Sequence, residues 1–254
     1  MEMPVNRFKR GLKSGEILYG FWAGLCSPTA SEVIATSGAD WLCIDTEHAA
    51  VDLTDVIQHL RALKGTDCAP VVRPAWNDMV IIKRLLDGGV QSLLVPYVQS
   101  AEEARAAVAA TRYPPDGVRG VAGANRTSAF GRVKDYLQTA HQEIAVVVQI
   151  ETRKAVENLE AIAAVEGLDG ILVGPSDLSA SLGHLGNPGH PEVQAVIADI
   201  AARAKAAGCP AGLFCMTPEE AERGLAMGYR FFSLGVDVAF VRQAADALVK
   251  RFKG

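Results

Sequence analysis

The chain has 254 residues, of which 49% are hydrophobic and 21% are charged, and its formal net charge is −4. This length fits one α/β barrel or two smaller domains. The charges of both signs are interspersed, which excludes the basic stripe of a nucleic-acid-binding protein. No apolar run approaches the roughly 18 residues that a bilayer crossing needs, so we expect no membrane partner.

Two further features favour a cytoplasmic protein. Residues 1–16 contain lysine and arginine but no apolar run after them, so we expect no secretory signal peptide. The five cysteines are odd in number and form no C-x-x-C pair. Free cysteine behaves as a small hydrophobe, and this pattern favours buried, reduced thiols over disulfides.

From residue 17 onward, short apolar runs alternate with segments of helical periodicity. Ser27-Pro28-Thr29 marks the first helix start and Gly38 its stop. Thr217 and Pro218 later combine an N-cap with proline at the first helical position. The last helix carries an apolar face between residues 241 and 252. The predicted strands are 17–25, 41–45, 69–73, 92–96, 146–152, 169–174, 211–214 and 231–236.

Eight strands, each followed by a helix, predict a single (β/α)8 barrel domain over residues 1–254. Parallel neighbours need a crossover helix, and eight such units close at about this length. An open doubly wound sheet is the alternative, which the lack of G-x-G-x-x-G at the first helix disfavours. Segment 114–131 is the longest irregular stretch, and loops this long in compact domains are usually functional.

Polar side chains collect where the predicted strands end, while the strand interiors are apolar. In a barrel of this class the active site lies at the C-terminal ends of the strands. The gathering of polar residues at these ends therefore predicts an enzyme. The residues at these ends are Asp45, His48, Arg73, Pro96, Gln149, Glu151, Asp177, Phe214 and Asp237.

Glu151 and Asp177 follow two consecutive predicted strands. Two carboxylates without a nearby cysteine or second histidine suit a hard divalent cation with oxygen ligands. The alternative is that Glu151 caps its helix and Asp177 accepts backbone N–H bonds in a turn. The residues alone leave both interpretations open.

His48 and Arg73 are the candidate catalytic groups. Asp45 lies three residues before His48, where it could orient the imidazole as a general base. The alternative is a loop histidine beside a solvated aspartate. Arg73 would either pair with a structural acid or bind a substrate carboxylate. No lysine lies at a strand end, which argues against a Schiff base.

Several ordered motifs together resemble the HpcH/HpaI aldolase family over nearly the whole chain. The motifs are Ile44-Asp45-Thr46-Glu47-His48-Ala49, Val72-Arg73-Pro74-Ala75-Trp76-Asn77-Asp78, Leu93-Leu94-Val95-Pro96, Gly117-Val118-Arg119-Gly120-Val121, Val148-Gln149-Ile150-Glu151-Thr152 and Gly170-Ile171-Leu172-Val173-Gly174-Pro175-Ser176-Asp177-Leu178-Ser179. The resemblance implies a class II pyruvate aldolase. Such an enzyme reversibly cleaves 4-hydroxy-2-oxo acids to pyruvate and an aldehyde, such as succinic semialdehyde, through a metal-bound pyruvate enolate, for example in aromatic catabolism.

The resemblance also implies roles for individual residues. Glu151 and Asp177 would hold Mg, Mn or Co, and Arg73 would contact the enolate oxygen. The N–H groups of Ser176 and Asp177 would hold the pyruvate carboxylate, with Gln149 close by. His48 with Asp45 would form the catalytic dyad.

The resemblance further implies a hexamer, a trimer of dimers, in which the C-terminal helix is exchanged between subunits. Asp87 and segment 121–125, with Val121 and Asn125, would reach a neighbouring subunit's site. Segment 122–127 departs from the family pattern, so the identity of the aldehyde does not carry over. Trp22 and Leu213 are candidates for an apolar wall beside the aldehyde, or for barrel core.

Two other functions remain as alternatives. An acyl-CoA lyase of the citrate lyase β or malate synthase-like group shares the barrel and the acid pair, and it would turn over a CoA thioester. A non-catalytic barrel that binds 2-oxo acids would lack the dyad or a metal ligand. The sequence around His48 disfavours the first, and the presence of all these residues disfavours the second.

Overall fold

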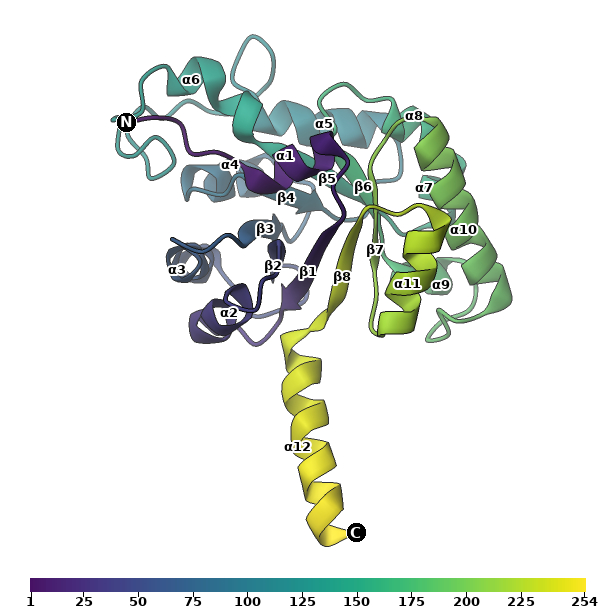
Figure 1. The fold of residues 1–254 in the computed structure, drawn as a ribbon. Coiled ribbons are helices and arrows are strands. Elements are labelled where there is room, and N and C mark those ends of the chain that lie inside the picture. The colour runs from purple at the N-terminus through teal and green to yellow at the C-terminus, as the bar shows by residue number, and fades with distance from the viewer.

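The computed structural model describes residues 1–254, and its eight parallel strands close into a barrel in chain order (Figure 1). Because β8 pairs with β1, the sheet has no free edge. The predicted (β/α)8 architecture is confirmed. The strands are β1 (Leu18–Ala23), β2 (Trp41–Asp45), β3 (Ala69–Arg73), β4 (Ser92–Val95), β5 (Ala145–Ile150), β6 (Gly170–Val173), β7 (Ala211–Phe214) and β8 (Phe231–Val236).

Helices follow the strands and cover the outside of the barrel (Figure 1). Several begin where a hydroxyl accepts a free backbone N–H, as at Ser27, Thr152 and Thr217. They are α1 (Arg7–Ser14), α2 (Pro28–Ala35), α3 (Leu53–Ala62), α4 (Met79–Asp87), α5 (Ala101–Thr111), α6 (Tyr136–Thr139), α7 (Arg153–Glu157), α8 (Leu159–Ala163), α9 (Pro175–Ser181), α10 (Pro191–Ala206), α11 (Pro218–Met227) and α12 (Asp237–Lys253), with a 3-10 turn η1 (Ala140–Glu143). None of them is both long and apolar enough to span a membrane.

The apolar side chains form two cores because successive residues of a strand point to opposite faces. An outer core of 50 buried residues fills the layer between strands and helices, and an inner cluster of 12 fills the barrel. In the inner cluster, the rings of Trp41 and Phe231 occupy the space where Gly20 and Gly212 would carry a Cβ. Glycine at these two positions therefore lets large aromatic rings fill the barrel.

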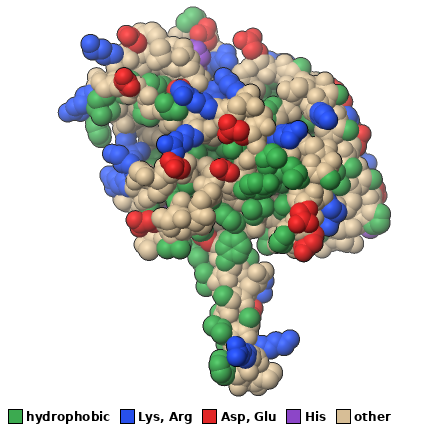
Figure 2. Space-filling view, in the orientation of Figure 1, with side chains coloured by type: hydrophobic (Ala, Val, Ile, Leu, Met, Phe, Trp, Pro, Cys, Tyr) green, Lys and Arg blue, Asp and Glu red, His purple; other side chains and the backbone are tan.

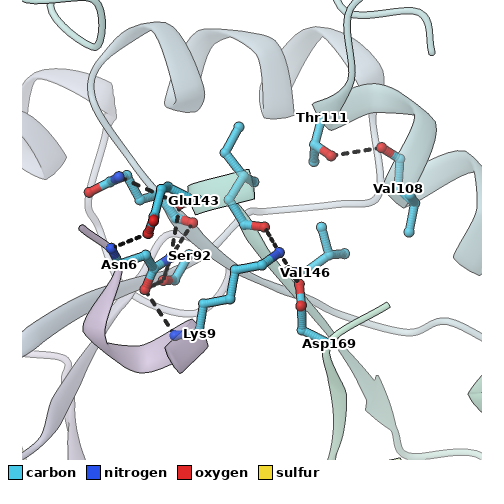
Figure 3. Close-up of polar contacts among 10 residues, drawn as sticks. Asn6, Lys9, Ser92, Val108, Thr111, Glu143, Val146 and Asp169 are labelled. Carbon is cyan, nitrogen blue, oxygen red and sulfur yellow. Dashed lines mark hydrogen bonds and ion pairs between the residues drawn. The ribbon is translucent and has the colours of Figure 1, made fainter. Parts of the chain in front are cut away.

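Helix α1, which the sequence pattern did not predict, closes the N-terminal end of the barrel. Phe8 and Leu12 of this helix belong to the inner cluster. Asn6 caps the helix, and its Nδ2 donates to the Ser92 Oγ at 3.0 Å (Figure 3). The Lys9 Nζ forms a buried ion pair with Asp169 at 2.9 Å. These contacts fix α1 across one end of the barrel, so the opposite end is left for chemistry.

Local contacts set the boundaries of two helices. The N-cap of α4 is Asp78, because its carboxylate accepts two backbone N–H groups while the Asn77 Nδ2 donates to the Glu103 carbonyl. The helical segment after β5 ends at Asn158 and resumes as α8.

Helix α12 projects away from the barrel (Figure 1). Its first turn is fixed by the buried Asp237, whose Oδ1 accepts the Gly24 N–H at 2.8 Å and the Leu25 N–H at 3.1 Å. Beyond that turn its residues are exposed, and hydrophobic side chains run along it (Figure 2). The exposed apolar residues of α12 are Val238, Phe240, Val241, Leu248, Val249 and Phe252.

Candidate active site

A cavity of about 340 Å³ lies at the C-terminal ends of the strands. Its lining contains no lysine. A larger cavity of about 960 Å³ lies at the other end, beside residues 1–7, and contains none of the predicted site residues. The lining of the first cavity includes Trp22, Asp45, His48, Arg73, Gln149, Ser176, Asp177 and Phe214.

Arg73 is the buried cation of this cavity. Its Nε and Nη2 donate to the two carboxylate oxygens of Asp45, at 2.9 and 2.7 Å, in a bidentate pair. The strand register sets this pair, because Asp45 and Arg73 are direct neighbours in β2 and β3. The Arg73 Nη1 lies 2.8 Å from the Glu47 Oε2 and 3.3 Å from the Gln149 Oε1. A guanidinium has five N–H groups, so one on Nη2 remains for a ligand.

Glu47 also belongs to this site, through its contact with Arg73, although no role was predicted for it from the sequence. Burial raises its pKa, and the charge of Arg73 opposes that rise. For Asp45 the balance is reversed: burial would raise its pKa, but the hydrogen bonds and charge of Arg73 hold it below the ordinary value. The signal for Glu47 was its place between Asp45 and His48 at a strand end.

Glu151 follows β5 directly and is buried. Its Oε1 accepts the backbone N–H of Tyr97 at 2.7 Å, and its Oε2 accepts the Gln149 Nε2 at 2.8 Å. Burial raises the pKa of Glu151 to about 7, the Tyr97 N–H opposes that rise, and the negative charge of Asp177 adds to it. A Cβ at Gly174 would lie 2.7 Å from the Glu151 Oε2, so glycine there makes room for the carboxylate.

Ser176 and Asp177 lie in the first turn of α9, which begins right after β6. Because Pro175 takes the first helical position, the N–H groups of Ser176 and Asp177 have no helical carbonyl to bond. Both residues line the cavity, and the charge of Asp177 acts on Glu151. The two carboxylates therefore lie at the same end of the barrel, beside free amide donors.

His48 lines the cavity with its side chain 65% exposed. The expected contact between Asp45 and the imidazole is absent. Both Asp45 oxygens bond to Arg73, and the Asp45 Oδ1 also accepts the backbone N–H groups of Glu47 and His48 at 3.0 and 3.3 Å. Asp45 thus holds the His48 backbone rather than its ring, and the carboxylate beside the imidazole is that of Glu47, with 3.9 Å between the His48 Nε2 and the Glu47 Oε1.

The two candidates for an apolar wall lie in different places. The Trp22 ring faces the Arg73 guanidinium, with 5.2 Å from its carbon to the ring centroid, and Phe214 packs edge-on to Trp22 at 5.1 Å. Leu213 points away from the cavity into the outer core, against Gly224 of α11. Trp22 is therefore placed beside the charged groups, whereas Leu213 is not.

The candidate cross-subunit residues lie outside the cavity. Asp87 is partly exposed and accepts from the Nη2 of the fully buried Arg119 at 2.7 Å. Val121 is exposed, and the Asn125 Oδ1 accepts the Ser128 N–H at 3.2 Å. The segment between α5 and α6 is largely free of helix and strand, in agreement with the irregular stretch expected there.

The structure is a closed parallel barrel in which acids surround one arginine at the strand ends. The chain belongs to the HpcH/HpaI aldolase/citrate lyase family, whose model matches residues 18–244, and it is therefore a carbon–carbon lyase of the aldolase class. Enzymes of this family depend in general on a divalent metal ion.

Individual relatives cover almost the whole chain. It is 53% identical to a pyruvate aldolase of Rhizobium etli, across 99% of each protein. It is 49% identical to a 5-keto-4-deoxy-D-glucarate aldolase of an Enterobacter species, across 98% of this chain and 97% of that protein. A crystal structure of an HpcH/HpaI aldolase/citrate lyase family protein from Burkholderia cenocepacia superposes with a TM-score of 0.95 at 41% identity, covering 98% of this chain and 100% of the other.

The residues present fit a divalent cation. Glu151, Asp177 and Glu47 act on one another as like charges, and the nearest arginine already serves Asp45 as well. Burial together with like-charge repulsion leaves Glu151 short of positive charge. Carboxylate oxygens are the ligands that hard divalent ions prefer.

Proposed function

We propose that the chain catalyses the reversible aldol cleavage of 4-hydroxy-2-oxo acids to pyruvate and an aldehyde, with residues 1–254 as one catalytic domain. The observation that carries the proposal is the buried carboxylate of Glu151, which packs against Gly174 beside the cavity lined by Asp177 and Arg73. Mg, Mn or Co held by Glu151 and Asp177 would supply positive charge to the oxygen that becomes negative during cleavage.

The chain's own residues would bind and orient the 2-oxo acid. Arg73, held in place by Asp45 and Glu47, would donate its remaining N–H to the 2-oxo oxygen. The free N–H groups of Ser176 and Asp177 would hold the substrate carboxylate. Gln149 links Arg73 to Glu151 and keeps the two groups in one orientation.

His48 would move the proton in the cleavage step. It takes the proton of the C4 hydroxyl while the C3–C4 bond breaks, so the C4 oxygen becomes the aldehyde carbonyl. The electron pair of the broken bond passes to the pyruvate enolate, which then takes a proton at C3. The exposed position of His48 suits a hydroxyl group that projects out of the cavity.

We also propose a homo-oligomer in the cytoplasm, a hexamer built as a trimer of dimers, in which α12 is exchanged and Asp87, Val121 and Asn125 reach a neighbour's site. The exposed apolar stripe of α12 supports the exchange, because apolar patches of this kind mark contact surfaces. The five unpaired cysteines agree with a reducing compartment.

The experiment is pyruvate release from 4-hydroxy-2-oxo acids, with and without EDTA. We expect chelation to abolish turnover and added Mn²⁺ to restore it. Glu151→Gln should lower kcat/KM by at least about 10²-fold, because it removes a ligand of the ion. Glu157→Gln, an exposed acid at the end of α7, is the matched control and should keep full activity. Full activity after EDTA, or in Glu151→Gln, would refute the cation mechanism.

A substrate panel distinguishes the remaining possibilities. It should include 4-hydroxy-2-oxo acids with short and long aldehyde halves, 5-keto-4-deoxy-D-glucarate, and a CoA thioester such as a malyl-CoA. We expect turnover of the 2-oxo acids alone. Turnover of the thioester instead would favour the acyl-CoA lyase alternative, and binding without turnover would favour a 2-oxo acid binding protein.

A further inference from the structure

Two exposed aromatic residues stand on the same end of the barrel as the acids, and the proposed mechanism uses neither. Trp76 lies in the loop from β3 to α4, three residues after Arg73, and Tyr97 lies in the loop from β4 to α5. Their rings are 5.8 Å apart with an interplanar angle of 32°, although 52% of Trp76 and 41% of Tyr97 remain exposed. The pair therefore joins two loops without being part of the core.

The backbone of Tyr97 has an unusual conformation. Its φ is +56°, in the left-handed region that residues with a Cβ enter only where their surroundings impose it. In this conformation the Tyr97 N–H donates to the Glu151 Oε1 at 2.7 Å. The strained residue is thus the one whose amide contacts the buried carboxylate.

We propose that Tyr97 is a positioning residue for Glu151, and that the tilted contact of its ring with Trp76 holds the backbone in the conformation this requires. The inference rests on the proposed cation site. Tyr97 fixes the Oε1 and Gln149 fixes the Oε2, so the carboxylate has one orientation before any ion binds. Groups that orient a metal ligand in this way strengthen metal binding.

The ring contact also explains why a tyrosine occupies a position where glycine would be unstrained. Glycine would adopt φ near +56° freely, but it would equally adopt other conformations in which the N–H turns away from Glu151. The ring of Tyr97, packed on Trp76, restricts that freedom. Trp76 lies in the loop that follows Arg73. The contact between the Trp76 and Tyr97 rings therefore joins this loop to the loop that orients Glu151.

The test is a Mn²⁺ titration of the metal-free protein without substrate, with thermal unfolding of each variant measured in parallel. We expect Tyr97→Gly to weaken Mn²⁺ binding about tenfold, the lower end of the loss that follows removal of an outer partner. Trp76→Ala should weaken it in the same direction by a smaller factor. Tyr97→Phe keeps the ring and should bind Mn²⁺ as the parent does.

Phe130→Gly is the matched control, because Phe130 is also an exposed aromatic residue with a positive φ, +58°, but it has no contact with Glu151. It should leave Mn²⁺ affinity unchanged. Equal Mn²⁺ affinity in the parent, Tyr97→Gly and Trp76→Ala would overturn the inference while leaving the cation site intact. A parent protein that binds no Mn²⁺ would overturn the proposed cation mechanism and the inference together. Weaker binding with an unchanged unfolding temperature would support positioning over a general structural role.

Discussion

The strand ends around Arg73 and the projecting helix α12 differ in which side chains they bury and which they expose. Around Arg73, charged groups are buried, and Asp45 and Glu47 find their partner within the chain. Along α12, apolar side chains are exposed beyond the first turn. A buried charge is costly unless it has a partner of opposite charge close by. An exposed apolar stripe can instead be covered when it packs on another surface. The charged groups are paired within the chain, whereas the apolar side chains of α12 are left exposed by it.

The largest expected effect follows from removing the central charge. Arg73→Met leaves the buried Asp45 and the partly buried Glu47 without a cation, which should cost about 3–5 kcal/mol of unfolding free energy. Urea unfolding measures this loss. The matched variant on the other region is Arg242→Met, which breaks the exposed Arg242–Asp246 pair of α12 and should cost no more than about 1 kcal/mol. Equal losses in the two variants would contradict the contrast.

A charge on the stripe of α12 should have the next largest effect. If α12 packs on a second copy, Val241→Glu loses the burial of one valine in each subunit, about 1.5–3 kcal/mol, and adds an unpaired charge. We expect sedimentation velocity to show dissociation. Gln243→Glu places the same side chain on the opposite face of α12 and should leave the assembly intact. An unchanged oligomer in Val241→Glu would refute exchange through this stripe.

The smallest expected effect is a change in the pH dependence of stability. The Asp45 pKa is lower in the folded protein than the roughly 3.9 of an unfolded aspartate. Its stabilising contribution is therefore complete above about pH 4 and is lost as pH falls through the lower folded value. Urea unfolding at several pH values from 6 to 3 should show a shallower acid loss for Asp45→Asn than for the parent. Asp246→Asn on α12 should keep the parent's slope, and a parent-like slope in Asp45→Asn would count against the pairing.

The barrel was predictable because a parallel strand buried on both faces is a continuous apolar run, as in residues 145–150, and because the helix starts carry caps. Helix α1 was not predictable, because lysine and arginine stand between Phe8 and Leu12 in the sequence. These two side chains form one apolar face only once the segment is helical, and that face packs on the barrel. The stripe on α12 was visible in the sequence, but the direction of the helix was not.

The candidate site, like the fold, was predictable from the sequence only in part. Its residue types and strand ends could be read from the sequence, but the partner of Asp45 could not. His48 is near in sequence, whereas Arg73 is a direct neighbour only through the register of β2 and β3. Glu47 and Tyr97 were missed for a related reason: their roles depend on contacts between strands and loops distant in the chain.

The aromatic filling of the barrel also constrains the kinetics. Phe8, Trp41 and Phe231 block the far end, so molecules enter and leave the cavity through one mouth. Two products that share a single passage must depart in turn, the outer before the inner. If Arg73 holds the pyruvate half as proposed, the aldehyde departs first in cleavage, and in the reverse direction pyruvate has to arrive first. The steady-state pattern should therefore be that of an ordered mechanism.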